Sequence, residues 1–210
     1  MNNAIDHFSV GADTLQQGVE FLKSALGVEI PKGGKHSMMA THNCVMRTGV
    51  DCFLELIAID PDEKPTRARW FSFDEPATRR RLAERPRPLC WVVRTDDLDA
   101  VVQSSPIDLG EVVKLSRGER NWHLTVPADG HLPGHGLLPA FIEWSPGPHP
   151  SVGQQDLGVT LRRIVLTTPE PARLISTLKA LKIDHLAEVQ EGPTNLGFEL
   201  NTALGAVMLA

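Results

Sequence analysis

The sequence predicts an α+β fold assembled from repeated βαβββ modules. The first observation is that an order of strand, helix and three strands can be read three times along the 210 residues. The second is that the three copies begin alike, with DHFSVGADTL, CWVVRTDDL and RRIVLTTPEP, and end alike, with CFLELIAI, AFIEWS and GAVMLA. Such internal repetition describes the architecture of a chain. Because one module has a single apolar sheet face that it cannot bury alone, we expect the modules to pair.

The first module is predicted from short apolar segments and one amphipathic segment. Strand 4–10 precedes a helix whose apolar side chains recur at helical spacing up to Leu26. Asp13 or Thr14 is expected to cap this helix, and Gly27 stands where a helix stop belongs. The remaining strands of the first module are predicted at 28–30, 43–47 and 51–59.

The second and third modules follow the same pattern. The helix of the second is capped by Asp96 or Asp97, and the helix of the third begins at Pro169. The second module is predicted to contain strand 89–95, a helix carrying Leu98, Val101 and Val102, and strands 110–116, 121–126 and 137–144. The third is predicted to contain strand 161–167, helix 169–182, and strands near 187–190, 196–200 and 206–209.

This order divides the chain into two expected domains. Residues 1–150 would form the first, from modules 1–60 and 88–145 joined by an arginine-rich connector at 61–87, and the third module would occupy 158–210. The connector is open to two readings. It is a solvated link between modules, or it forms a basic rim over a pocket for an anionic ligand.

Composition excludes several classes of protein. A net charge of -5 disfavours a nucleic-acid partner, and 41% hydrophobic residues exclude general disorder. No apolar run approaches the ~18 residues of a membrane helix. Three cysteines are few, and an odd number does not indicate a disulfide framework. With no signal peptide at the N-terminus, we expect a cytoplasmic protein without a membrane partner.

Two acidic residues stand at matching places in apolar strands. Glu55 lies in FLELI and Glu143 in FIEW. A carboxylate in such a strand must be paired, hydrogen-bonded, protonated or metal-bound. The pair has a functional role, or it consists of two satisfied polar groups that line a core. His7 and Glu55 could point into one cavity, and such a set suits zinc, iron, manganese or nickel.

The other candidate residues carry weaker signals. His36 and His42 flank the SMMAT segment of a Gly-rich loop, and substrate contact, metal ligation and plain loop packing all remain open. Cys90 opens the second module in an apolar strand, where an inert core thiol is more usual than a nucleophile. The sequence holds no G-x-S-x-G, C-x-x-C, Walker or G-x-G-x-x-G motif.

The runs IDHFSVGADTLQQGVEFLKSALGV, GGKHSMMATHN, CFLELIAIDPD, RWFSFD, CWVVRTDDLDA and PAFIEW resemble the glyoxalase-like domain family of the vicinal oxygen chelate superfamily, over about residues 4–145. The resemblance implies two modules paired into a cupped mixed sheet around a cavity, with metal ligands on first and last strands. His7, Glu55 and Glu143 match three of the four ligand positions. Cys90 holds the fourth, where His or Glu is usual. The third module has Arg163 and Met208 at these positions, so it cannot form such a site.

Two functions are compatible with this resemblance. In the first, a divalent metal acts as a Lewis acid on a small substrate with adjacent oxygens, in a lyase, isomerase or dioxygenase reaction. Glu55 or Glu143 supplies a ligand or a base. The substrate-binding residues are then predicted to be His36, His42, Asn43, Trp91, Arg117 and Trp122. In the second, the chain is a metal-free protein that binds or sequesters a small molecule.

The third module raises a question of assembly. If the first two modules close on each other, its apolar sheet face has no partner. It then pairs with its copy in a second chain, giving a homodimer, or it packs on the outer face of the first pair.

Overall fold

A computed structural model describes residues 2–210, which form 12 strands and 4 α-helices. The first module comprises β1 (Ala4–Gly11), α1 (Leu15–Leu26), β2 (Lys32–His36), β3 (Thr41–Gly49) and β4 (Cys52–Ile59). The connector holds α2 (Pro76–Glu84). The second module comprises β5 (Arg87–Arg94), α3 (Leu98–Ser104), β6 (Glu111–Arg117), β7 (Arg120–Val126) and β8 (Ala140–Trp144). The C-terminal unit comprises β9 (Thr160–Thr168), α4 (Pro171–Ala180), β10 (Ala187–Glu191), β11 (Asn195–Thr202) and β12 (Gly205–Leu209). Two 3₁₀ turns, η1 (Pro133–Gly136) and η2 (Pro150–Gly153), flank β8.

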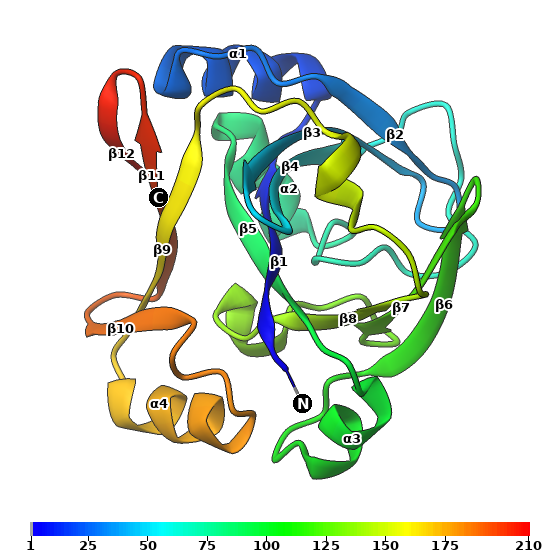
Figure 1. Cartoon of the computed structure of the whole chain (residues 1–210), viewed down its shortest axis with the longest axis vertical. Coiled ribbons are helices and arrows are strands. Elements are labelled where there is room, and N and C mark those ends of the chain that lie inside the picture. Colours follow the sequence, from blue (N-terminus) through cyan, green and yellow to red (C-terminus); the bar gives the residue numbers. More distant parts are fainter. Residues whose placement is uncertain (1) are drawn as a thin grey trace.

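The first two modules form one curled sheet, which confirms the predicted cupped fold. Its strand order is β2-β3-β4-β1-β5-β8-β7-β6. Within each module the first strand runs parallel to the last, and the antiparallel pair β1–β5 joins the modules at the centre of the sheet (Figure 1). In the resulting half-barrel, the neighbouring strands β1 and β4 both contribute to the same concave face.

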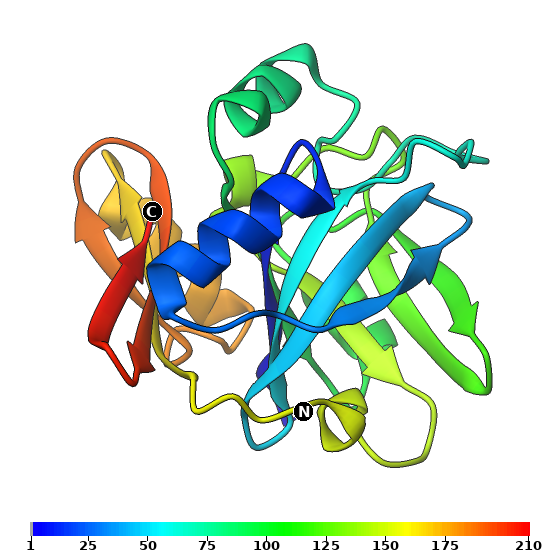
Figure 2. The same ribbon diagram turned by 90° about the horizontal axis from the view of Figure 1, so that it is seen from above.

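Two hydrophobic layers follow from the alternation of side chains along the strands. Ile57, Val92 and Ile142 belong to the layer on the concave side. Their neighbours Leu56 and Trp91 belong to the layer on the convex side, which α1 crosses in Figure 2. The central strands are therefore buried on both faces, and this explains their nearly continuous apolar sequences.

The C-terminal unit has the predicted order of elements but a different sheet. Its strand order is β10-β9-β11-β12, so β9 runs parallel to β10 rather than to the last strand β12. Phe198 of this sheet meets Phe8 of β1 at a ring distance of 4.8 Å, and both residues are fully buried. Of the two predicted arrangements, the structure has the one in which the third module packs on the outer face of the first pair. The apolar face that a second chain was expected to cover is therefore covered within this chain.

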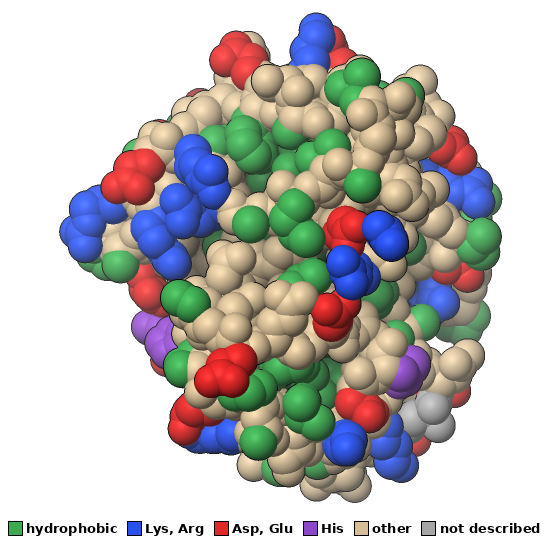
Figure 3. All heavy atoms as spheres, turned by 90° about the vertical axis from the view of Figure 1, so that its left-hand side faces the viewer, with side chains coloured by type: hydrophobic (Ala, Val, Ile, Leu, Met, Phe, Trp, Pro, Cys, Tyr) green, Lys and Arg blue, Asp and Glu red, His purple; other side chains and the backbone are tan. Residues whose placement is uncertain are grey.

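The exposed side of the C-terminal unit carries many charged side chains, although Leu204 and Met208 are also exposed. Figure 3 shows basic and acidic side chains side by side on this face. Among the ion pairs of this unit are those of Arg162 with Glu199, at 2.6 Å, and of Arg163 with Glu188. Residues 2–210 contain no helix with the length and apolar character needed to cross a bilayer. All three cysteines are buried and free.

Candidate functional site

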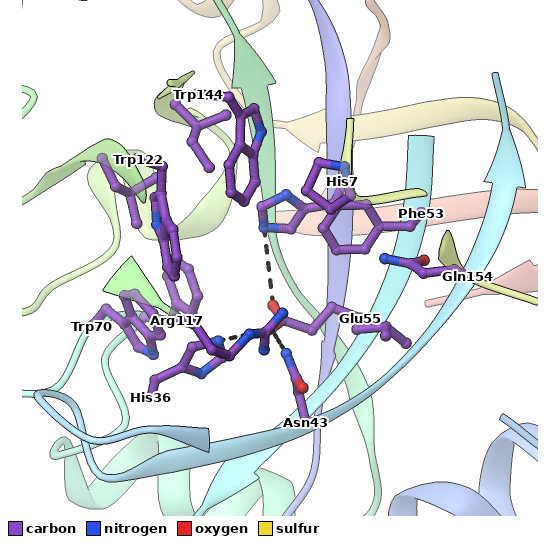
Figure 4. Close-up of a pocket in the computed structure, with 15 residues that line it drawn as sticks. His7, His36, Asn43, Phe53, Glu55, Trp70, Arg117, Trp122, Trp144 and Gln154 are labelled. Atoms are coloured by element: carbon purple, nitrogen blue, oxygen red, sulfur yellow. Dashed lines mark hydrogen bonds and ion pairs between the residues drawn. The ribbon is translucent and has the colours of Figure 1, made fainter. Parts of the chain in front are cut away.

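A pocket lies on the concave face of the half-barrel, between the two modules (Figure 4). The cavity has a volume of about 40 Å³, which is room for roughly three water molecules. The pocket is lined by His7, His36, Asn43, Val45, Phe53, Glu55, Trp70, Phe71, Arg117, Trp122, Leu124, Ile142, Trp144, Pro150 and Gln154. Aromatic side chains thus surround a small group of polar ones.

Glu55 is the buried acid of this pocket. It is 5% exposed, in the middle of β4. Ser9 Oγ donates a hydrogen bond to its Oε2 at 2.8 Å, and Asn43 Nδ2 donates one to its Oε1 at 2.7 Å. Burial raises the pKa of Glu55, but His7, His36 and these hydrogen bonds outweigh it and lower the pKa below its ordinary value. The carboxylate is therefore ionised at neutral pH.

His7 faces Glu55 from the neighbouring strand. Its Nε2 lies 4.0 Å from Glu55 Oε2, and its Nδ1 contacts Asp6 Oδ1 at 2.6 Å. The ring stacks on Phe53 with a centroid distance of 4.6 Å. A register shift of β1 against β5 between Ile5 and His7 allows consecutive side chains of β1 to contact each other here. His7 is thus held between two carboxylates.

His36 stands on the other side of Glu55. Its Nε2 lies 4.0 Å from Glu55 Oε1, while its Nδ1 contacts Thr41 Oγ1 at 3.1 Å. Burial lowers the pKa of His36 to about 4; Glu55 opposes this shift, and the charge of Arg117 adds to it. His36 is therefore a neutral imidazole at pH 7.

Two hydrogen-bond donors of the pocket lack a partner. Arg117 Nη1 and Trp70 Nε1 are buried and have no hydrogen-bond partner among residues 2–210. Burial lowers the pKa of Arg117, and the charge of Glu55 opposes this shift. Buried donors normally find an acceptor, so each of these two N–H groups is open to an acceptor atom of a ligand. The guanidinium lies beside Glu55 and His36 in Figure 4.

The connector contributes aromatic residues to this pocket. Trp70 and Phe71 line it, and their rings stack at 5.1 Å. The connector arginines Arg67 and Arg69 instead pair with Glu111 and Asp74. The connector therefore borders the pocket, but none of its arginines lines it.

Six of the predicted site residues line the pocket, and three do not. Those in the pocket are His7, Glu55, His36, Asn43, Arg117 and Trp122. His42 Nδ1 lies 4.0 Å from Asp60 Oδ2 outside it. Trp91 belongs to the convex layer, where its indole N–H donates to Leu137 O at 3.2 Å.

Glu143 is the third predicted residue outside the pocket. Its neighbour Ile142 lines the pocket, and successive residues of a strand point to opposite faces. The Glu143 carboxylate instead accepts a hydrogen bond from Leu98 N at 2.8 Å, at the start of α3. Aligning FLELI with FIEW on their glutamates places the two segments one residue out of structural register. For this reason the alignment wrongly predicted that Glu143 lies on the same face of the sheet as Glu55.

The predicted metal ligands are not brought together. Glu143 lies on the opposite face, and Cys90 is a fully buried thiol whose pKa burial raises well above its ordinary value. Across the described residues 2–210, no three His, Cys, Asp or Glu side chains are grouped so that they could hold a metal ion. The charge of Arg117 also acts on Glu55 and His36, which opposes a second cation beside them. The residues present therefore do not fit a resident metal.

Several pocket residues were missed by reasoning from sequence. They are the lining residues Phe53, Trp70, Phe71, Pro150 and Gln154, together with Asp6 and Ser9, which contact His7 and Glu55. Alternation in β1 could have placed Ser9 on the same face as His7. Nothing local predicted Asp6, because strict alternation would put its side chain on the opposite face from His7.

Two βαβββ modules joined through their first strands around a polar pocket define the architecture of the vicinal oxygen chelate proteins. A model of the glyoxalase-like domain family matches residues 5–182, and the chain belongs to this family. The matched range includes β9 and α4 of the C-terminal unit. A comparison with curated proteins gives no match.

A comparison with solved structures finds similar chains at low sequence identity. A hypothetical protein from Staphylococcus aureus covers 99% of this chain and 84% of its own length, with a TM-score of 0.62 and 14% identity. Methylmalonyl-CoA epimerase from Mycobacterium tuberculosis covers 69% of this chain and 89% of its own, with a TM-score of 0.44 and 17% identity. A methylmalonyl-CoA epimerase solved with methylmalonyl-CoA covers 71% of this chain and 100% of its own, with a TM-score of 0.45 and 15% identity.

Proposed function

We propose that the chain is an enzyme of the lyase or isomerase type, which moves a proton on a small substrate that bears an oxyanion. The observation that carries this proposal is the position of two proton acceptors, His7 Nε2 and Glu55 Oε2, 4.0 Å apart beside the unpartnered donors of Arg117 and Trp70. The site thus combines a base with groups that stabilise negative charge.

The tautomer of the neutral His7 ring follows from its contacts. Hydrogen bonds from His149 and His7 outweigh burial and hold the pKa of Asp6 far below its usual range, so Asp6 is a carboxylate. The Nδ1–H of His7 then donates to Asp6 Oδ1, and the lone pair of Nε2 faces the pocket. A neutral histidine in this tautomer is able to accept a proton from a bound substrate.

The proposed step begins with a substrate whose carboxylate or carbonyl oxygen accepts from Arg117 and Trp70. His7 Nε2 removes a proton from the carbon next to the carbonyl. The C–H electron pair forms a carbon–carbon double bond, and the carbonyl pair moves to oxygen, which gives an enolate beside the guanidinium. The imidazolium lies between Asp6 and Glu55, whose charges stabilise it. Return of a proton to the opposite face of the enolate or to another of its atoms completes an isomerisation, and loss of a leaving group from the neighbouring carbon completes an elimination.

Solvent-deuterium exchange tests this step directly. We expect the untagged protein in D₂O to accelerate loss of the C3 proton signals of pyruvate or 2-oxobutyrate, measured by proton NMR. His7→Gln should lower the rate by about 10²–10⁴-fold. The matched control His185→Gln changes an exposed histidine of the C-terminal unit and should keep the wild-type rate.

Two outcomes contradict this proposal. Equal exchange rates in wild type and His7→Gln would remove His7 as the base. Exchange that disappears after chelator treatment and returns on addition of zinc, iron, manganese or nickel would show that the reaction needs a metal. Elemental mass spectrometry of the same untagged samples then identifies it.

A metal-free binding protein remains the second candidate. The tilted pair of Trp122 and Trp144, with ring centres 5.2 Å apart, favours it, because two indoles supply stacking area for a ligand. This reading predicts that pyruvate quenches tryptophan fluorescence without any deuterium exchange, and that His7→Gln retains the affinity. Arg117→Ala should weaken binding under either reading.

A further inference from the structure

One buried carboxylate gathers three hydrogen-bond donors from distant parts of the chain. Asp6 is 0% exposed. Its Oδ1 contacts His7 Nδ1 at 2.6 Å, and its Oδ2 accepts from Trp144 Nε1 at 2.8 Å and contacts His149 Nε2 at 2.9 Å. Trp144 ends β8, and His149 belongs to the segment 145–158 that leads to the C-terminal unit. This segment therefore takes part in the pocket, which its Pro150 and Gln154 line.

The contacts of His149 determine which of its nitrogens carries the proton. The backbone N–H of Ser151 donates to His149 Nδ1 at 3.2 Å, so in the neutral ring this nitrogen accepts. The hydrogen of the ring is then on Nε2, which donates to Asp6 Oδ2. With the indole N–H of Trp144, His149 satisfies Oδ2 and leaves Oδ1 for His7.

The neutral His7 ring can donate its one N–H to either of two carboxylates, those of Asp6 and Glu55. With its proton on Nδ1 it donates to Asp6 at 2.6 Å, whereas with its proton on Nε2 it would donate toward Glu55, 4.0 Å away. The shorter and fully buried contact favours the first tautomer. Only that tautomer presents a lone pair to the pocket.

We propose that Asp6 is a positioning residue, held in place by Trp144 and His149, which sets the tautomer of His7 and so makes its Nε2 a base. The proposal rests on the proposed proton-transfer function for its kinetic consequence, but the tautomer itself is a property of the free protein. Without the charge of Asp6, Glu55 is the remaining carboxylate near the ring. The proton then moves to Nε2, and His7 loses its basic atom in the pocket.

Nitrogen-15 NMR of histidine-labelled protein measures the tautomer without any substrate. The His7 signals are those absent from His7→Gln. In the neutral ring of the wild type, measured above the pH at which the His7 signals titrate, we expect a protonated Nδ1 and an unprotonated Nε2. In Asp6→Asn we expect the reverse, together with a fall of about tenfold or more in kcat for pyruvate exchange at little change in KM. Asp60→Asn, which changes another buried aspartate, should leave the His7 signals as in the wild type.

Circular dichroism shows whether Asp6→Asn folds. If it does not fold, variants of His149, which donates to Asp6 Oδ2, still test the proposal. His149→Ala removes one donor from Oδ2 and should slow exchange, whereas His149→Gln restores an N–H donor and should recover most of the rate. Equal rates in the Ala and Gln variants would overturn the role of His149. An unchanged tautomer of His7 in folded Asp6→Asn would overturn the proposal for Asp6.

The proposed role of Asp6 and the proposed proton transfer can be contradicted independently of each other. If Asp6→Asn moves the proton of His7 while the wild type exchanges no probe, the positioning role of Asp6 holds and the proposed proton transfer is lost. If exchange depends on His7 while the tautomer of His7 is unchanged in Asp6→Asn, the proposed proton transfer holds and the positioning role of Asp6 is lost.

Discussion

For a single residue, the face of the strand on which it lies decides its chemistry. Glu55 and Glu143 both follow an apolar pair in a strand, yet one is a pocket acid and the other caps a helix. Their environments differ, since Glu55 lies between His7 and His36 while Glu143 accepts a hydrogen bond from the backbone N–H of Leu98. The same residue type therefore has two roles.

Glu143→Ala tests the helix-capping role. Loss of the hydrogen bond to Leu98 N leaves the start of α3 without this acceptor, and we expect the free energy of unfolding to fall by about 1 kcal/mol. Urea unfolding monitored by circular dichroism measures the change. An unaltered midpoint would mean that water replaces the carboxylate at no cost.

His36 predicts a pH dependence of stability. Burial lowers the folded pKa to about 4, below the ordinary value of 6.5. Between these values the unfolded chain binds a proton that the folded chain does not, so stability falls as pH is lowered from 6.5 toward 4, by about 3 kcal/mol in total. His36→Gln should show a shallower loss across this window in urea titrations at several pH values. Parallel profiles for both proteins would contradict the assignment.

For the secondary-structure elements, the sequence predicted their order better than their pairing. Apolar periodicity located α1, the central strands and α4 within a few residues of their observed bounds. The strand expected at 28–30 forms instead at Lys32–His36, inside the segment read as a loop, because its residues pair with β3 rather than pack in a core. The order β10-β9-β11-β12 was not predictable, since partner choice depends on which face meets the half-barrel.

The positions of the candidate site residues were predicted correctly for some and wrongly for others, on the same physical ground. Glu55 and His7 were found because polar residues in buried strands need an explanation. Asp6 was missed because it lies at a register shift of β1, and Glu143 was misplaced because a one-residue error reverses a strand face. Trp70 and Gln154 come from irregular segments, whose path through space follows from tertiary packing alone.

Packing of α1 on β4 leaves no room at Gly18. A β-carbon there would lie 2.3 Å from Leu56 Cδ1, in the buried convex layer. Alanine usually stabilises a helix by about 1 kcal/mol relative to glycine, but here we expect Gly18→Ala to destabilise the protein by about 1–3 kcal/mol. Gly49→Ala, whose added carbon would meet Cys52 at an ordinary 3.5 Å, serves as the control in thermal unfolding. A stabilised Gly18→Ala would show that α1 shifts freely.

At the scale of the whole molecule, the two sheets share one hydrophobic layer. Phe198 and Ile164 of the C-terminal unit are buried in the same cluster as Phe8 and Trp91 of the half-barrel. Neither sheet can expose its side of this layer without exposing the other. We therefore expect the two sheets to unfold in one transition.

Phe198→Ala tests this shared core. All four tryptophans of the chain precede the C-terminal unit, so their fluorescence reports only on the half-barrel and its connector. We expect the variant to lose about 3–5 kcal/mol, and the fluorescence and circular dichroism transitions to shift together. A fluorescence transition that stays at the wild-type position would show that the C-terminal sheet unfolds alone.

The route of segment 145–158 has a consequence for how this chain can vary. The segment begins at a strand of the half-barrel, places His149 against Asp6, and ends at the first strand of the C-terminal sheet. An insertion or deletion would change the length of chain between β8 and β9, whose positions are fixed, and would displace His149 from Asp6. Unlike most surface connections, this one should tolerate changes of residue type at its exposed positions far better than changes of length.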